Sequence, residues 1–162
     1  MTFISGGQTG IDRAMLDFCM DNHLRCGGWC PDHRQAEDGT IDPGYPVKEL
    51  AGASYTQRTQ ANVRESDATV IIFHGEMTGG TLKSREFALG NHKPLLLLDM
   101  REITVEEAAA KLGDFIQNHR PDVLNFSGPR KSEWEEGYRV CRSILDRVYD
   151  QLGLSGFNLS PS

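Results

Sequence analysis

At 162 residues with average composition, the chain can bury a core, and we expect one folded domain over residues 1–152 and a frayed tail at 153–162. Its formal net charge of −6 argues against generic binding to nucleic acid or to an anionic membrane surface. The longest apolar run, residues 95–98, is too short to cross a bilayer, no secretory leader precedes the first strand, and four cysteines are too few for a disulfide scaffold. These features favour a cytoplasmic protein.

The first predicted elements are a strand at residues 2–4, a glycine turn and a helix that follows without a spacer. Glycine lets the backbone approach a ligand, and the free N–H groups at a helix start point toward it, so this turn is a predicted anion site. Its candidate binding residues are Gly6, Gly7, Gln8, Thr9, Gly10 and Arg13. A structural alternative stays open, because Thr9 and Asp12 match a capping pair and Arg13 fits a solvated charge.

A short second strand is predicted at residues 25–29, followed by a long polar loop at residues 30–46 with little to bury. The loop leaves the carboxyl end of a strand, which is the edge of an open α/β sheet where ligands bind, and this position favours a functional loop. Arg34 is its candidate ligand-binding residue.

A polar helix at residues 56–65 offers the candidate binding residues Arg58, Thr59 and Asn62, since positions 58 and 62, and positions 59 and 62, share a face. We expect Arg34 and Arg58 to close over the ligand from the loop and from this helix. The run at residues 68–73 is typical of a strand buried on both faces.

Residues 74–81, directly after this strand, repeat the arrangement of the first turn, in which a strand is followed by glycines, a hydroxyl residue and a helix. Its candidate binding residues are Gly79, Gly80 and Thr81. The helix is expected to run from Thr81 to about Asn91.

The last third of the chain continues the alternation with a buried strand at residues 95–99, a helix at 104–118 and a strand at 123–126. Thr104 and Glu107 form a predicted capping box. Ser132 and Glu135 are expected to cap a final helix that ends near residue 152.

Five strands that alternate with helices predict an α/β fold: a three-layer, Rossmann-like open parallel sheet with helices on both faces. The expected strand order is 2-1-3-4-5, which places the first and third strands side by side. Their two glycine turns would then face each other across one crevice, an arrangement suited to a ligand that carries a phosphate and a second polar group.

Groups suited to catalysis or metal binding are sparse. Cys26, Cys30 and His33 offer three ligands where a structural zinc site needs four, so we favour free thiols and predict no metal site. Glu86 is the best-placed carboxylate, but its position fits a surface charge. The sequence therefore predicts a binding protein without catalytic residues.

Several motifs, spread from the first strand to the last helix, carry a resemblance to a known family: Gly6-Gly7-Gln8-Thr9-Gly10-Ile11-Asp12-Arg13, Gly28-Trp29-Cys30-Pro31, Ala36-Glu37-Asp38-Gly39, Tyr55-x-x-Arg58-Thr59-x-x-Asn62-Val63, Ser66-Asp67-Ala68-Thr69, Thr78-Gly79-Gly80-Thr81 and Leu124-Asn125-x-x-Gly128-Pro129-Arg130. Together they resemble the putative molybdenum carrier family. The resemblance implies a Rossmann-like fold of the SLOG superfamily and a carrier or storage protein for molybdenum cofactor (molybdopterin), a phosphorylated pterin. We expect this or another nucleotide-like phosphorylated ligand as the small-molecule partner, and a homo-oligomer.

Two alternatives stay open: a nucleotide phosphoribohydrolase, and a domain that senses nucleotides or nucleotide sugars. The hydrolases of the superfamily carry Pro-Gly-Gly-x-Gly-Thr-x-x-Glu after a strand. The corresponding residues 77–86 lack the proline and the third glycine, and Glu86 comes too late after Thr81. This departure favours the carrier.

Overall fold

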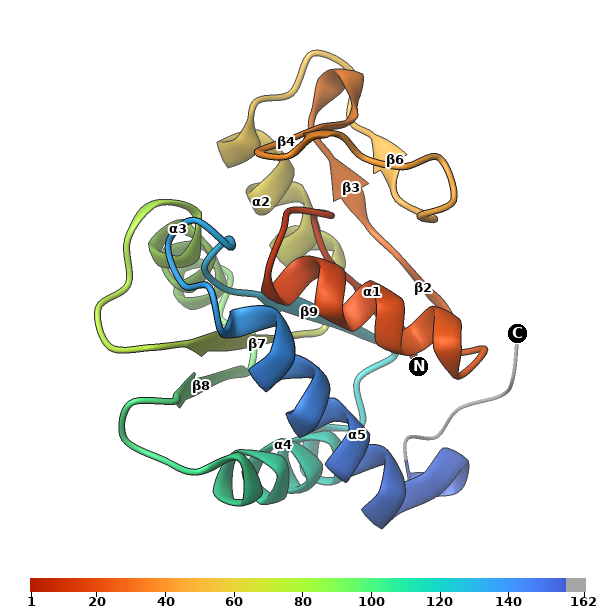
Figure 1. Cartoon of the computed structure of the whole chain (residues 1–162), viewed down its shortest axis with the longest axis vertical. Coiled ribbons are helices and arrows are strands. Elements are labelled where there is room, and N and C mark those ends of the chain that lie inside the picture. Colours follow the sequence, from red (N-terminus) through yellow and green to blue (C-terminus); the bar gives the residue numbers. More distant parts are fainter. Residues whose placement is uncertain (157–162) are drawn as a thin grey trace.

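A computed structural model of the chain describes residues 1–156, and its main feature is a parallel sheet with helices on both faces (Figure 1). All the strand pairs in this sheet are parallel. In spatial order the strands are β2 (Cys26–Gly27), β1 (Thr2–Ile4), β9 (Val123–Ser127), β7 (Ala68–Phe73) and β8 (Leu95–Asp99). The predicted fold class, a three-layer Rossmann-like sheet of five main strands, is confirmed.

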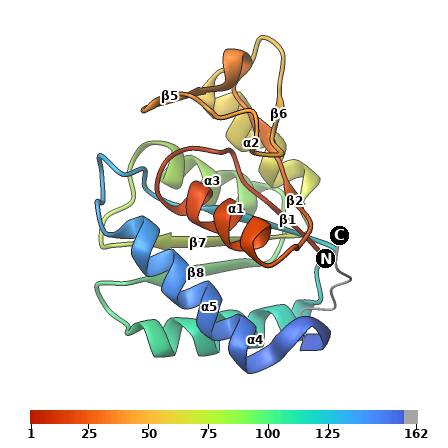
Figure 2. The same ribbon diagram turned by 45° about the vertical axis from the view of Figure 1, so that its right-hand side comes forward.

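The helices form the two outer layers (Figure 2). One layer holds α1 (Ile11–Asp21), α5 (Gly137–Gly156) and α4 (Val105–His119), with α5 packed between the other two. The second layer holds α2 (Tyr55–Glu65) and α3 (Gly79–Gly90), which pack against each other. Within residues 1–156 none of the helices combines the length and apolar character needed to span a bilayer.

The predicted strand order 2-1-3-4-5 is wrong for this chain, because the fifth predicted strand, β9, lies between β1 and β7. In β9, Leu124 is the register partner of Phe3 on one side and of Ala68 on the other. Its three middle residues are buried, as a central strand requires. By contrast, β8 is an edge strand whose Leu97 is 40% exposed, and not the fully buried strand that its leucines predicted. An apolar run indicates burial but does not identify the neighbouring strands.

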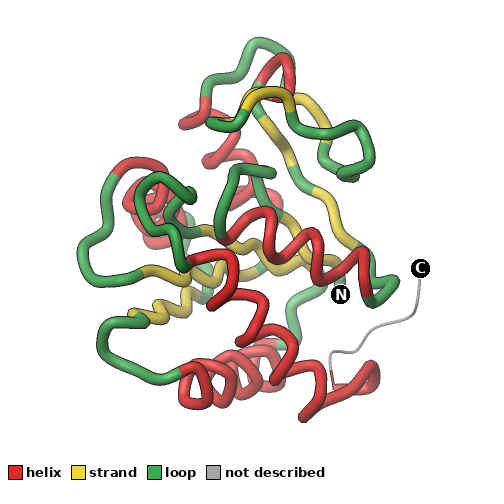
Figure 3. Tube along the Cα trace, in the orientation of Figure 1, coloured by secondary structure: helices red, strands yellow, loops and turns green. Residues whose placement is uncertain are grey.

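The predicted loop at residues 30–46 has more structure than expected (Figure 3). A short 3₁₀ helix, η1 (Asp32–Arg34), leads into an antiparallel pair, β4 (Gln35–Ala36) and β5 (Gly39–Thr40). The expected second strand is split, since β3 (Trp29–Cys30) leaves the main sheet and pairs with β6 (Lys48–Glu49). The expectation of little to bury is also wrong: Ile41 is fully buried and joins the core.

The residues at the helix starts agree with only some of the predicted N-caps. The Thr104 hydroxyl accepts a hydrogen bond from the backbone N–H of Glu107 at 3.1 Å, so the predicted cap of α4 is confirmed. The predicted cap of α5 by Ser132 and Glu135 is wrong, because α5 begins only at Gly137. The alternative of a capping pair at Thr9 and Asp12 is also excluded, because the N-cap of α1 is Gly10.

The C-terminal helix α5 extends to Gly156, with non-helical geometry at Gly153, where φ is 62°. The regular helix is therefore interrupted directly after residue 152, where it was expected to end. Residues 157–162 of the expected frayed tail lie outside the described residues.

Candidate functional site

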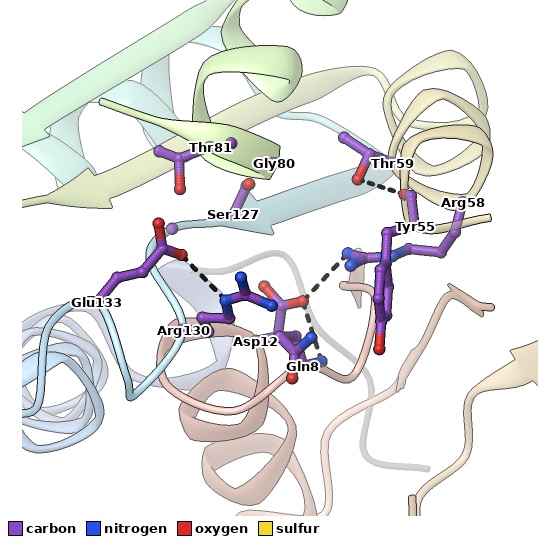
Figure 4. A pocket seen from close by; sticks show the side chains of 12 residues that line it. Gln8, Asp12, Tyr55, Arg58, Thr59, Gly80, Thr81, Ser127, Arg130 and Glu133 are labelled. Atoms are coloured by element: carbon purple, nitrogen blue, oxygen red, sulfur yellow. Dashed lines mark hydrogen bonds and ion pairs between the residues drawn. The ribbon is translucent and has the colours of Figure 1, made fainter. Parts of the chain in front are cut away.

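A cavity of about 160 Å³ opens where the turns after β1, β7 and β9 meet (Figure 4). The inserted strand β9 brings its own turn between the two glycine turns, so all three contribute to the lining. The lining residues come from these turns and from the starts of α1, α2 and α3: Gln8, Asp12, Tyr55, Arg58, Thr59, Gly79, Gly80, Thr81, Ser127, Gly128, Arg130 and Glu133.

The start of α3 forms one wall of the cavity. Thr78 is the N-cap residue, but its hydroxyl does not cap the helix and donates to Glu133 Oε2 at 2.9 Å. Gly79 has a φ of +51°, a backbone conformation that glycine adopts without strain. At Gly80 an added Cβ would meet no atom within 4 Å. The first N–H groups of a helix have no acceptor within the helix, so this open end can bind an anion.

Arg58 forms the opposite wall, where its side chain is only 12% exposed. One terminal nitrogen lies 3.4 Å from Asp12 Oδ2, and the guanidinium lies 5.9 Å from the ring centre of Tyr55. Its Nε is buried and has no hydrogen-bond partner among the described residues. A Cβ at Gly6 would lie 1.9 Å from the same guanidinium, so Gly6 provides room for Arg58.

Asp12 occupies the first glycine turn. Its carboxylate accepts hydrogen bonds from the backbone N–H groups of Gln8, at 3.2 Å, and of Gly6. Burial raises the pKa of Asp12, although the charge of Arg58 and these hydrogen bonds oppose the shift. The donors that the sequence assigned to a ligand therefore bind the protein's own carboxylate.

The other two glycines of this turn allow segments of the chain to approach each other closely. Gly7 has a φ of +76°, and a Cβ there would lie 3.0 Å from Ile41. Gly10 has a φ of +83°, and a Cβ there would lie 2.5 Å from the carbonyl oxygen of Pro129. Neither glycine lines the cavity.

Gln8 and Thr9 connect this turn to the long loop through Glu37. The side-chain oxygen of Gln8, which lines the cavity, accepts from the backbone N–H of Glu37 at 2.9 Å. The Thr9 hydroxyl donates to Glu37 Oε1 at 2.5 Å. Glu37 also accepts from the hydroxyl and the N–H of Ser132, and Arg130 Nε lies 3.6 Å from it. These contacts explain why neither Thr9 nor Ser132 caps a helix.

Arg13 lies outside the cavity. Its Nε donates to the carbonyl oxygen of Gly7 at 2.8 Å, its two terminal nitrogens bind Asp38 at 2.9 and 3.0 Å, and its guanidinium lies over Tyr45. It lines a separate open groove with Tyr45 and Tyr138.

Arg34 also lies outside the cavity. Each of its guanidinium nitrogens donates to carbonyl oxygens within residues 41–47, at distances from 2.7 to 3.2 Å. The structure thus gives no support to closure of Arg34 over the cavity, because this arginine holds its own loop together.

Neither Asn62 nor Glu86 lines the cavity. Asn62 exchanges two hydrogen bonds with the backbone of Trp29, at 2.8 and 2.9 Å, and so fixes β3 to α2. Glu86 lies on the surface of α3, 3.5 Å from Lys83, and does not line the cavity.

Sequence reasoning missed Tyr55, Ser127 and Glu133 as lining residues, and gave Asp12 only a capping role. The available signal was the position of residues 127–133 directly after a predicted strand, at the sheet edge where ligands bind. Their closeness to the two glycine turns depends on strand order, which the sequence pattern did not reveal.

The lining has mixed charge, which limits what it can bind. Arg58 and the start of α3 favour an anion, while Asp12 and Glu133 are acceptors for hydroxyl or N–H groups. Arg130 is balanced by Glu133, 3.4 Å from its Nε, and is 44% exposed at the mouth. Tyr55 provides an aromatic surface beside Arg58. The arrangement suits a ligand with a phosphate, polar hydroxyls and a flat ring.

The family model described as the circularly permutated YpsA SLOG family matches residues 3–149 of the chain. A crystal structure of a protein named putative molybdenum carrier protein, from Syntrophus aciditrophicus SB, is 39% identical in sequence and has a TM-score of 0.89. The similarity covers 91% of this chain and 93% of that one. No curated protein matches the chain.

The strand order agrees with a permuted sheet. When the strands are renumbered from β7, so that β1 follows β9, the observed order becomes 2-1-3-4-5. The predicted order therefore describes the same sheet with a different starting point along the chain.

Proposed function

The chain belongs to the circularly permutated YpsA SLOG family, and from this membership we propose that its cavity binds a phosphorylated small molecule without converting it. One observation carries the proposal: the start of α3 and Arg58, whose buried Nε has no hydrogen-bond partner among the described residues, belong to the lining of the same cavity. A guanidinium and the free N–H groups at a helix start both donate charge-assisted hydrogen bonds to phosphate oxygens.

We propose molybdenum cofactor, or its pterin part molybdopterin, as the ligand. Support comes from the protein from Syntrophus aciditrophicus, which is named as a molybdenum carrier and matches most of this chain. In this proposal the phosphate lies at Gly79, Gly80 and Thr81, and the flat pterin lies against Tyr55. The groups that act on this ligand are backbone N–H groups, one arginine and an aromatic ring. The corresponding proposed roles are carrier or storage protein, in the cytoplasm.

A nucleotide hydrolase is the second candidate, and the position of Asp12 favours it. This carboxylate lines the cavity, and burial raises its pKa, as in many groups that exchange a proton with a substrate. Glu133 lies in the same lining, whereas Glu86 lies outside it. A hydrolase would therefore depend on Asp12 or Glu133.

The carrier and the hydrolase can be distinguished by the molecule that stays bound during purification and by any product that is released from a nucleotide. Protein purified from its own host is expected to carry a fluorescent pterin, visible in native mass spectrometry and in a fluorescence scan. Bound nucleotide instead would contradict the pterin and favour a nucleotide-sensing domain.

Turnover is tested with a panel of nucleoside 5′-monophosphates, in which released base is measured for the wild type and for Asp12→Asn. We expect no release. Release at about one per second or faster that disappears in Asp12→Asn would refute the carrier and establish the hydrolase.

We also propose that the chain associates with copies of itself.

A further inference from the structure

The turn between α1 and β2 brings two cysteines together. Cys19 lies in the last turn of α1, Cys26 is the first residue of β2, and the two elements pack against each other (Figure 1). The chain reverses at His23, where φ is 56°, and the N–H of Leu24 donates to the carbonyl oxygen of Cys19 at 2.8 Å. This reversal places the two thiols in hydrogen-bonding contact.

The two thiols differ in their access to solvent. All four cysteines of the chain lie in the part that the structure describes, and Cys26 alone is half-buried while the others are buried. Cys19 is fully buried, and its single S–H has two sulfur acceptors within reach, Met15 Sδ at 3.7 Å and Cys26 Sγ. A reagent from solvent therefore meets Cys26 first, with Cys19 directly behind it.

Their surroundings also give the two thiols different reactivity. The hydrogen bond from Cys19 lowers the pKa of Cys26, although partial burial opposes this shift. Burial raises the pKa of Cys19, which keeps this thiol protonated. The thiolate is the nucleophilic form of cysteine, so Cys26 is the residue suited to attack and Cys19 the residue suited to react second.

We propose that Cys26 and Cys19 form a redox site, in which Cys26 reacts with hydrogen peroxide and Cys19 then closes a disulfide. In the first step the Cys26 thiolate attacks one peroxide oxygen, the O–O bond breaks, hydroxide leaves and Cys26 becomes a sulfenic acid. In the second step the Cys19 sulfur attacks the Cys26 sulfur, and the S–O bond breaks as an S–S bond forms. The Cys19 proton leaves with the departing hydroxyl group as water. The two thiols lose two electrons in total, and the peroxide is reduced.

The disulfide would tie the end of α1 to an edge strand. β2 is two residues long and pairs only with β1 in the main sheet, so α1 provides its second attachment. A cross-link between residues 19 and 26 restricts the unfolded chain and should raise the unfolding temperature by about 5–10 °C. Intracellular disulfides are mostly transient and redox-sensing, which is the role that we assign to this pair. The redox site does not depend on the proposed ligand.

Peptide mapping tests the pairing. The protein is treated with hydrogen peroxide, its remaining thiols are blocked with N-ethylmaleimide, and it is digested with trypsin and chymotrypsin. Cleavage after Trp29 separates Cys26 from Cys30, so the two can be told apart. We expect a peptide that links Cys19 to Cys26 and disappears on reduction, with free thiols falling from four to two. A link from Cys19 to Cys141, or four free thiols after treatment, would overturn the proposal.

Trapping with dimedone, a reagent for sulfenic acids, tests the two roles. Cys19→Ala removes the second thiol, so the sulfenic acid should persist and dimedone should label Cys26, whereas the wild type should lose this label as the disulfide forms. Cys19→Ser should give the same labelling with less change in packing. Cys26→Ala should leave the buried Cys19 unlabelled. Labelling of Cys19 instead of Cys26 would refute the assigned order.

Thermal unfolding with and without dithiothreitol tests the cross-link between α1 and β2. The oxidised wild type should unfold about 5–10 °C above the reduced protein. Cys26→Ala should lose this difference, and the matched control Cys30→Ala, which removes a neighbouring buried thiol, should keep it. A difference that persists in Cys26→Ala, or is absent in the wild type, would contradict the proposed cross-link.

Discussion

Gly80→Ala should separate ligand affinity from stability. Gly80 is the second residue of α3, and a Cβ at this position would point into open space. Its backbone is not in the left-handed region, so alanine fits without strain. The only thing that the added methyl group can obstruct is a ligand at the start of the helix.

Gly80→Ala should maintain or raise the stability of the fold but lower its affinity for the ligand. Alanine is favoured over glycine inside a helix by up to about 1 kcal/mol and by less in the first turn, so the free energy of unfolding should stay constant or rise slightly. A phosphate kept away from one helix N–H loses a charge-assisted hydrogen bond worth about 1.5–3 kcal/mol. The dissociation constant should therefore rise about 10- to 150-fold.

Calorimetric titration with a nucleoside monophosphate or a pterin phosphate, together with thermal unfolding, measures both quantities. Gly90→Ala is the matched control, because Gly90 is in the same helix and a Cβ there would also meet no atom within 4 Å. It should leave affinity unchanged. Wild-type affinity in Gly80→Ala would show that the anion does not bind at the start of α3.

Three further predictions concern the opposite wall and the loop. Gly6→Ala should lower the free energy of unfolding by about 1–3 kcal/mol, because its Cβ would lie 1.9 Å from the Arg58 guanidinium. Urea denaturation should show that this loss largely disappears in the double variant Gly6→Ala/Arg58→Ala. Burial raises the pKa of Asp12, and protonation of this carboxylate should release Arg58 from its ion pair. Sulfate should therefore bind more tightly as the pH falls toward the pKa of Asp12. The variant Asp12→Asn should bind sulfate tightly at neutral pH, and its affinity should not depend on pH in this way. Burial tends to raise the pKa of Glu37, but hydrogen bonds from Ser132 and Thr9 and the charge of Arg130 lower it below its ordinary value. The ionised Glu37 therefore stabilises the fold above pH 4.5, and this stabilisation is lost as the pH falls through the lowered pKa. Glu37→Gln should therefore lower the unfolding temperature at pH 7 and much less in acid, and a uniform effect at all pH values would refute this reading.

The sequence predicted the elements well because each leaves a local pattern. The glycine turn before α1, the apolar run of β7 and the Thr104 cap are decided by residues close together in the chain. The second glycine turn, predicted as a candidate binding segment, lies in the lining of the cavity, whereas Gly7 and Gly10 of the first turn do not.

What could not be predicted depended on contacts between distant residues. Arg34 and Arg13 appeared to be ligand-binding residues, but loop carbonyls and Asp38 bind them. A charged side chain in a glycine-rich segment has the same pattern whether its partner is a ligand or the chain itself. Asp12 is the opposite case, a residue whose place in the cavity was not predicted, because its role depends on Arg58, which is far away in the sequence.

The central position of β9 has a consequence for how the protein is made. During synthesis β1, β2, β7 and β8 are all made before residues 123–127, and without these residues they can form only two separate pairs with open edges. The sheet closes when β9 enters between them and pairs with both. The edges of β1 and β7 that pair with β9 therefore stay unpaired until β9 has been made, and pairing between such distant segments is slow. Folding is in this sense post-translational, and a chaperone that covers strand edges would act on this chain before its last strand appears.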